Sequence, residues 1–317
     1  MTIVGLLGAS GFLGQRVARA LVGRGATVHP VPAPRLSTGG RDLEALLADL
    51  QSPGSQRERD RLADELAGCS AVVNAAGRAD ATASGDELFG ADALLPGVVA
   101  AATPDPARFV HVSSAAVQGR IAVLDEAGAH HPFSPYSQAK SLGERLASAV
   151  NERTVCFRPT SVHGPGRPVT QQLVRVLASP LASVAGRGDR PTPQVLVQNV
   201  ADACAFLALV DEQPPSVVLH PSEGLTTAEL VRLLGGREPR RIPTPAARVV
   251  VGAGRVVGRW SAPAAGVARR LELLWFGQSQ QRGWLDGRWT APAGRQAWKE
   301  AAWKEAAWKE TAWKELA

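Results

Sequence analysis

Short apolar runs alternate with amphipathic stretches along most of the chain. Runs rich in Val, Ile and Leu are typical of buried strands, whereas apolar residues at helical spacing are typical of helices packed on a sheet. Strands are expected at Ile3–Leu7, Ala26–Val31, Ser70–Asn74, Arg108–Val112, Val155–Arg158, Val195–Val197 and Val217–Leu219. Helices are expected at Gln15–Val22, Ala93–Ala102, Val169–Leu177 and Val200–Val210. The alternation predicts an α/β fold built on a doubly wound parallel sheet of the Rossmann type.

The alternation breaks in two places. Residues 41–67 are polar and helical in pattern without a good strand, so an abbreviated sheet edge is expected there. After residue 219 comes a helix capped by Thr226 or Thr227, then a basic, proline-broken helical region. We therefore expect a dinucleotide-binding domain of residues 1–164 and 195–219, and a smaller substrate lobe of residues 165–194 and 220–296.

The last segment, residues 297–317, repeats a Trp-Lys-Glu-Ala-Ala pentad. Its alanines and its Glu-before-Lys pairs at a spacing of four favour a helix. Successive tryptophans turn by about 140° around a helix, so they form no single apolar stripe. The pattern predicts an appended helix that does not dock on the body and that has no part in catalysis.

Composition is that of an ordinary globular protein, with 45% hydrophobic and 20% charged residues. No apolar run is long enough to cross a bilayer, and no secretory signal pattern is visible at the start. The three cysteines, Cys69, Cys156 and Cys204, lie far apart among apolar neighbours without metal-ligand spacing. They indicate buried thiols in a reducing compartment, so no metal site and a cytoplasmic location are expected.

The positive charge is concentrated in the C-terminal part. The whole chain carries +6, whereas residues 220–296 contain twelve arginines and five acids, which gives 12 − 5 = +7. Either this is a solvated surface, or the lobe meets an anionic small-molecule substrate or an acidic membrane face. No nucleic-acid partner is expected, because no binding motif or interleaved aromatic residues accompany the charge.

A glycine-rich turn follows the first expected strand. Gly8, Gly11 and Gly14 stand three residues apart between a strand and a helix, with Ser10 and Phe12 between them. Glycines in that context allow a tight turn and a close approach of the backbone to a pyrophosphate at the helix N-terminus. We interpret these five residues as a dinucleotide-binding loop.

The end of the second expected strand bears on the choice of cofactor. An acidic residue there would bind the adenosine ribose of NAD, but the chain has Val31-Pro32-Ala33-Pro34 followed by Arg35. A guanidinium without a carboxylate favours a 2′-phosphate, so NADP(H) is the preferred cofactor and NAD(H) the alternative. After the third strand, the small residues Ala75, Ala76 and Gly77 would let the cofactor lie against the backbone.

The only tyrosine, Tyr136, and the only lysine before the terminal repeat, Lys140, stand four residues apart. On a helix both face the same side, and an ammonium beside a phenol brings the phenol pKa toward the working range of a proton-transfer catalyst. Ser134 is suited to cap that helix and Pro135 to its first turn. Ser114 ends the expected strand at residues 108–112, at the edge where open α/β sheets place their chemistry.

Four motifs in order resemble the extended short-chain dehydrogenase/reductases, the NAD(P)-dependent epimerase/dehydratase family. They are the glycine turn, His111-Val112-Ser113-Ser114-Ala115-Ala116-Val117-Gln118-Gly119, Tyr136-x-x-x-Lys140, and Arg158-Pro159-Thr160-Ser161-Val162-His163-Gly164-Pro165-Gly166. The resemblance implies that Ser114 and Tyr136 are catalytic and that Lys140 both binds the nicotinamide ribose and activates the tyrosine. It also places Pro159 and Val162 beside the cofactor.

The chain departs from the family pattern on the expected substrate side. Gln118 and His163 stand where the family usually has tyrosines, so both are candidate substrate contacts, although a loop histidine is more often a packing residue. Ala115 and Ala116 replace the Asp-Glu pair of sugar dehydratases, which argues against dehydration. The family's habit of pairing through the helix that carries the tyrosine leaves a homodimer open.

Three functions remain after these observations. The first is an NADP(H)-dependent oxidoreductase that reduces a carbonyl or oxidises a secondary alcohol by hydride transfer, with Tyr136 as acid and base. The second is a nucleotide-sugar epimerase with retained NAD, which the arginine-rich lobe favours and the missing acid after the second strand disfavours. The third is a non-catalytic nucleotide-binding protein, which has no need of Ser114, Tyr136 and Lys140 together.

Overall fold

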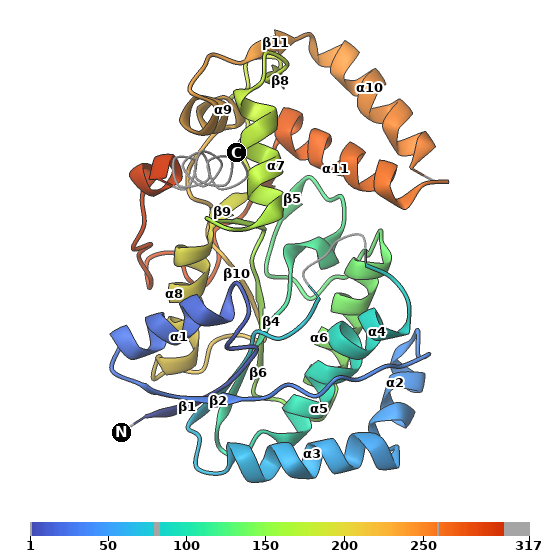
Figure 1. The fold of residues 1–317 in the computed structure, drawn as a ribbon, viewed down its shortest axis with the longest axis vertical. Helices are drawn as coiled ribbons and strands as arrows, with labels where there is room; N and C mark the ends of the chain where they lie inside the picture. Colours follow the sequence, from blue (N-terminus) through green and yellow to red (C-terminus); the bar gives the residue numbers. More distant parts are fainter. Residues whose placement is uncertain (1, 79–82, 259, 301–317) are drawn as a thin grey trace, which may run out of the picture.

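A six-stranded parallel sheet forms the centre of the molecule in this computed structural model, which describes residues 2–78, 83–258 and 260–300 (Figure 1). The strand order is β10-β6-β4-β3-β1-β2. The bounds are β1 Ile3–Leu7, β2 Thr27–Val31, β3 Ala71–Asn74, β4 Arg108–Val112, β6 Thr154–Arg158 and β10 Val217–Leu219. The predicted doubly wound parallel sheet is confirmed.

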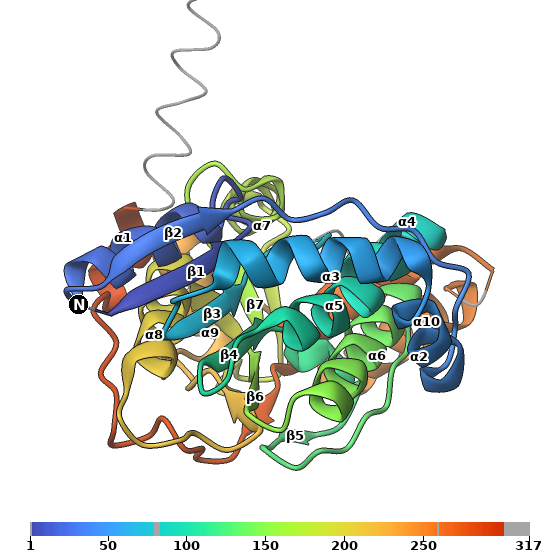
Figure 2. The same cartoon turned by 90° about the horizontal axis from the view of Figure 1, so that it is seen from below.

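Helices cover both faces of this sheet. The helices α1 Gly14–Gly23 and α8 Val197–Leu209 lie on one face, and α3 Pro53–Leu66, α5 Leu95–Ala102 and α6 Pro135–Val150 lie on the other (Figures 1 and 2). Each face has its own cluster of buried apolar side chains. Strands that are buried on both faces need continuous apolar runs, which is why these strands could be predicted from the sequence.

The sheet ends at β2, with no further strand beyond it among the described residues, which agrees with the expected abbreviated edge. The chain between β2 and β3 forms α2 Leu43–Leu50 and α3 without a further strand, and β3 returns to pair with β1 on its other side. Pro30 lies within β2, where an edge position tolerates a residue that cannot donate a backbone hydrogen bond.

A third apolar core belongs to the C-terminal part of the chain. It is formed by α7 Pro168–Ala178, α9 Thr227–Gly235, α10 Thr244–Val257, α11 Ala262–Phe276 and the paired strands β8 Ser183–Ala185 and β11 Arg240–Ile242. These elements gather at one end of the molecule (top of Figure 1). Two more short pairs, β5 Val123–Leu124 with β12 Ser279–Gln280 and β7 Ser161–His163 with β9 Gln194–Leu196, lie outside the main sheet.

The first tryptophan of the terminal repeat is part of this third core. Trp298 is 1% exposed, and its indole Nε1 donates to Glu223 Oε2 at 2.7 Å. The expectation that the repeat does not dock on the body is therefore wrong for Trp298, because a single anchored indole needs no apolar stripe along the helix. Residues 301–317 lie outside the described part of the chain.

The three cysteines are buried free thiols, as expected. Within the described residues, no helix has the length and apolar character needed to cross a membrane. The same residues hold no cluster of three or more potential metal ligands.

Candidate functional site

The glycine turn joins β1 to α1 and packs closely against the segment that follows β3. Gly8 has φ +80°, and a Cβ there would lie 2.6 Å from the Ala76 nitrogen. A Cβ on Gly14 would overlap the Gly8 carbonyl oxygen, which also accepts a hydrogen bond from the Gly11 nitrogen at 2.9 Å. Glycine is thus required by the backbone itself, and the tight cradle at the start of α1 fits a dinucleotide pyrophosphate.

Two arginines lie beside the glycine turn. The Phe12 ring lies under the Arg16 guanidinium at 4.4 Å and that of Arg167 at 5.2 Å. Arg167 is largely buried, which lowers its pKa, and its charge acts on Tyr136. Sequence reasoning missed Arg167; its one signal was its place just after the Gly-Pro-Gly of the last family motif. Ser10 is exposed on the turn, and its carbonyl oxygen accepts from Gln15 Nε2 at 2.9 Å.

The tyrosine helix α6 starts where the sequence indicated. Ser134 caps it in a capping box with Ser137, and Pro135 occupies the first turn. Ser114 lies two residues beyond the end of β4 and caps the short 3-10 helix η2 Ala115–Gln118, accepting from the Ala116 nitrogen at 3.2 Å.

The structure brings Ser114, Tyr136 and Lys140 together. Hydrogen bonding by Ser114 is among the influences that lower the pKa of Tyr136. Lys140 Nζ donates to the Val112 carbonyl oxygen at 3.2 Å, at the same strand end.

A buried carboxylate, Asp92, is the main addition to the predicted set. Its Oδ1 lies 3.1 Å from Lys140 Nζ and accepts from the Arg78 nitrogen at 3.1 Å, while Oδ2 has no hydrogen-bond partner among the residues that the structure describes. Asp92 lies in the π-helix η1 Gly90–Leu94, a form common at functional sites. A lone acid in the apolar run from Leu88 to Ala102 was the signal that could have revealed it.

Gly77, the last residue of the predicted cofactor segment, lies against the Asp92–Lys140 pair. It has φ +148°, and a Cβ there would overlap Asp92 Oδ1 and lie 3.2 Å from Lys140 Nζ. The predicted cofactor segment from Ala75 to Gly77 therefore passes directly over the lysine ammonium.

The pKa of Tyr136 is raised, contrary to the expectation of a lowered value. Burial is the largest cause, the Lys140 charge opposes it, and the Asp92 carboxylate adds to it. The ammonium does act in the predicted direction, but in this closed surrounding desolvation outweighs it. Asp92 also holds the pKa of Lys140 above its ordinary value.

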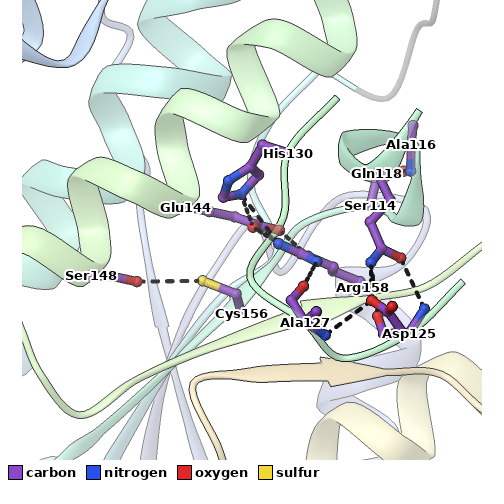
Figure 3. Close-up of polar contacts among 10 residues, drawn as sticks. All are labelled: Ser114, Ala116, Gln118, Asp125, Ala127, His130, Glu144, Ser148, Cys156 and Arg158. Atoms are coloured by element: carbon purple, nitrogen blue, oxygen red, sulfur yellow. Dashed lines mark hydrogen bonds and ion pairs between the residues drawn. The ribbon is translucent and has the colours of Figure 1, made fainter. Parts of the chain in front are cut away.

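The two predicted substrate contacts are both buried. Gln118 Nε2 donates to the Asp125 carbonyl oxygen at 2.9 Å and to Asp125 Oδ1 at 2.8 Å (Figure 3). His163 has hydrogen-bond partners on both ring nitrogens, among them Gln194 Oε1 at 2.6 Å, and burial lowers its pKa to about 4. Both substrate roles stay predictions, and this burial argues against them.

The other predicted cofactor residues are spread around the same sheet edge. The Pro159 carbonyl oxygen accepts from the Ala115 nitrogen at 2.9 Å, which ties the end of β6 to the Ser114 turn. The Val162 carbonyl oxygen accepts from Arg167. Arg35 is exposed beyond the end of β2. A ribose-phosphate contact by Arg35 stays a prediction.

One helical turn after Lys140, a buried ion pair joins α6 to β6 of the sheet (Figure 3). Arg158 Nη2 lies 2.6 Å from Glu144 Oε2, and His130 Nε2 lies 2.8 Å from the same oxygen. Both paired side chains are almost fully buried, and these partners lower the pKa of Glu144 to about 2. Because Tyr136, Lys140 and Glu144 are successive positions four residues apart on α6, this ion pair helps to hold the two candidate catalytic residues in place against the sheet.

A hollow of about 560 Å³ lies between residues 120–122 and the helices α10 and α11. Five arginines line it, Arg120, Arg190, Arg248, Arg255 and Arg269, together with the carboxylate of Glu272. Arg120 and Arg269 also lie over the ring of Phe133, at 5.2 and 5.7 Å, three residues before Tyr136. Arg120, Arg255 and Arg269 pair with Glu272. The hollow is therefore a mainly basic space that is linked to the tyrosine segment through Phe133.

Comparison with known proteins agrees with this geometry. The model of the NAD-dependent epimerase/dehydratase family matches residues 4–218. A ceramide reductase of Caulobacter vibrioides is 30% identical over 299 residues, covering 86% of this chain and 84% of that protein. A 4-hydroxy-2-methyl-3-oxo-4-farnesyl-3,4-dihydroquinoline-1-oxide ketoreductase of Stigmatella aurantiaca is 33% identical over 50% of this chain and 49% of its own length.

The fold also has close counterparts among solved structures. The UDP-glucuronic acid 4-epimerase of Bacillus cereus, solved with NAD, superposes with a TM-score of 0.62 over 96% of both chains at 16% identity. A dinucleotide cradle, a converging Ser-Tyr-Lys set and these relatives make the chain an NAD(P)-dependent oxidoreductase or epimerase. It belongs to the NAD-dependent epimerase/dehydratase family.

Proposed function

We propose that this enzyme is an NADP(H)-preferring reductase that converts a ketone carbonyl of an amphiphilic, lipid-like substrate into a secondary alcohol. The observation that carries the proposal is the convergence of Ser114, Tyr136 and Lys140 under the cofactor segment at Gly77. The two curated relatives support the direction and the substrate class, because both names denote reductases, one of a ceramide and one of a farnesyl-bearing molecule.

The residues of the chain divide the work of such a reduction. When bound, the nicotinamide supplies the hydride for the carbonyl carbon. The Ser114 hydroxyl holds the carbonyl oxygen by a hydrogen bond, and the Tyr136 hydroxyl gives that oxygen its proton. At neutral pH the phenol is protonated, as a proton donor must be, and the Lys140 charge acts to lower its pKa against the larger effect of burial. Lys140 stabilises the phenolate that is left.

The catalytic assignment is tested by two substitutions in this helix. Tyr136→Phe should abolish turnover of a long-chain ketone while cofactor affinity stays near wild type, because only the proton donor is lost. Lys140→Ala should damage both the rate and cofactor affinity, because the ammonium is expected to serve both. Stopped-flow oxidation of NADPH and fluorescence titration measure the two quantities. If the Tyr136→Phe variant kept more than a small fraction of the wild-type rate, Tyr136 would not be the proton donor.

The preference for NADP(H) depends on Arg35. Prolines 32 and 34 offer neither charge nor a backbone donor at the position where an acid would bind the NAD ribose. A charge-assisted contact of Arg35 with the 2′-phosphate is worth roughly 1.5–3 kcal/mol, or about ten- to a hundredfold in affinity. NADPH should therefore bind at least about tenfold more tightly than NADH, and Arg35→Ala should remove most of the difference. The exposed Arg57→Ala is the matched control. Equal affinities in the wild type would reject the preference.

A nucleotide-sugar epimerase is the second candidate, and the basic hollow favours it. Five arginines around one space could bind a diphosphate as readily as the polar end of a lipid. Incubation with UDP-sugars separates the two functions, because an epimerase would form the 4-epimer without net consumption of NADPH.

A further inference from the structure

The helix α10 exposes an apolar face that no described element covers. Val249 is 72% exposed, and Trp260, just beyond the helix end, is 79% exposed. At about 100° per residue, the exposed residues fall within one arc of roughly 120°. They are Val249, Val250, Ala253, Val256 and Val257. Val267 on α11 adds a further exposed apolar side chain.

The opposite side of α10 is firmly held. Ala247 and Val251 are buried in the core of the lobe. A Cβ on Gly254 would lie 3.0 Å from the Ala268 Cβ, so α10 and α11 pack closely as a hairpin. The hairpin lies at an outer corner of the molecule, away from the sheet (Figure 1). The apolar face is thus presented by a helix whose opposite side is packed in the core of the lobe.

The charge around this face is mainly positive, with Glu272 of α11 paired to Arg255 and Arg269. Residues 239–271 contain seven arginines and no aspartate, glutamate or lysine. Arg248 and Arg255 are exposed on α10, about 80° and 100° around the helix from Val256, and Arg240 and Arg241 are exposed on β11, just before α10. Two copies of such a surface would repel each other, whereas an anionic surface would attract it.

We infer that the α10–α11 hairpin docks on the surface of a lipid bilayer that contains anionic lipids. Valines and a tryptophan beside arginines are the composition of segments that lie in the interfacial region, with the indole at the headgroup level. The arginines would bind lipid phosphates, and each such contact falls off with ionic strength. The hairpin lies on the interface plane and does not cross it. The inference is independent of the proposed reaction.

Docking in this way would also orient the basic hollow. Arg248 and Arg255 of α10 line the hollow, so the hollow opens beside the docking helix. A docked hairpin would therefore bring the hollow next to the headgroup layer. A substrate with an apolar chain could enter from there without crossing water.

The test uses the full-length protein and vesicle flotation. Vesicles of phosphatidylcholine with phosphatidylglycerol should bind it at low salt, vesicles of phosphatidylcholine alone should bind it weakly, and high salt should release it. The variant Val249→Asp/Val257→Asp should lower the partition coefficient by about tenfold or more. Its reduction of a short, water-soluble ketone should stay unchanged. Val22→Asp is the matched control, because Val22 is 62% exposed on α1, far from the hairpin.

Three results would overturn the inference. The first is no binding of the wild type to the anionic vesicles at low salt. The second is equal binding by the double variant and the wild type, both folded by circular dichroism. The third is a wild-type dimer in sedimentation velocity that the double variant converts to a monomer, which would make the apolar face a contact between two copies of this chain.

Discussion

Removing the charge of Glu144 should destabilise the protein more than the loss of any exposed ion pair would. Glu144→Gln keeps the shape of the side chain but leaves the Arg158 guanidinium, which is fully buried, without its carboxylate (Figure 3). The pKa of Glu144 lies at about 2 against an ordinary 4.5. Each pH unit of that difference corresponds to about 1.4 kcal/mol, so the charge contributes about 3 kcal/mol at neutral pH. Loss of one partner of a buried pair typically costs about 3–5 kcal/mol, in agreement.

The assay is urea unfolding of wild type and variant at neutral pH, with a thermal melt beside it. A loss of about 3 kcal/mol should lower the melting temperature by roughly 6 °C, at about 2 °C per kcal/mol for a chain of this size. Glu87→Gln is the matched control. It makes the same change in a pair whose carboxylate is 71% exposed, and it should cost less than about 0.5 kcal/mol.

The pH dependence has a definite sign. Because the folded-state pKa of Glu144 lies below its ordinary value, its contribution is complete above about pH 4.5 and is lost as the pH falls toward 2. The difference in unfolding free energy between wild type and Glu144→Gln should therefore shrink over that range. A difference below about 1 kcal/mol at neutral pH, or one that does not change with pH, would refute the assignment of a buried charged pair.

Two further predictions concern residues that the structure added. Asp92→Asn should lower the pKa of Tyr136, because the Asp92 charge raises it. As the pH rises, the rate of carbonyl reduction should therefore begin to fall at a lower pH in this variant than in the wild type. An unchanged pH–rate profile would show that Asp92 does not influence the tyrosine. Trp298→Ala should cost roughly 3–5 kcal/mol in urea unfolding because it removes a buried indole and its bond to Glu223, whereas Trp260→Ala, at an exposed indole, should change stability little; equal effects of the two would contradict the docking of Trp298.

Local pattern was enough to predict most of the framework. The strand at Ile3–Leu7, the capped start of α6 and the glycine turn all depend on residues close together in sequence. A buried parallel strand needs an uninterrupted apolar run, and a helix start needs a cap within a few residues. For the same reason the four-residue spacing of Tyr136 and Lys140 was sufficient to place both on one face of a helix.

Contacts between distant segments could not be predicted in that way. The pairing of Asp92 with Lys140 joins η1 to α6, and that of Glu144 with Arg158 joins α6 to β6. Sequence spacing carries no information about which buried acid meets which base, because the match is made only when the helices pack on the sheet.

The environment of a side chain is likewise a tertiary property. The sequence predicted the direction in which Lys140 acts on Tyr136, but the net shift of the pKa depends on burial, which no neighbouring residue reveals. Trp298 belongs to a repeat with no apolar stripe and still docks, because a pocket in the lobe accepts one indole and Glu223 accepts its N–H. Local sequence thus determined the elements and the identity of the reactive groups, while packing decided their charge states and partners, since desolvation and distance exist only in the folded chain.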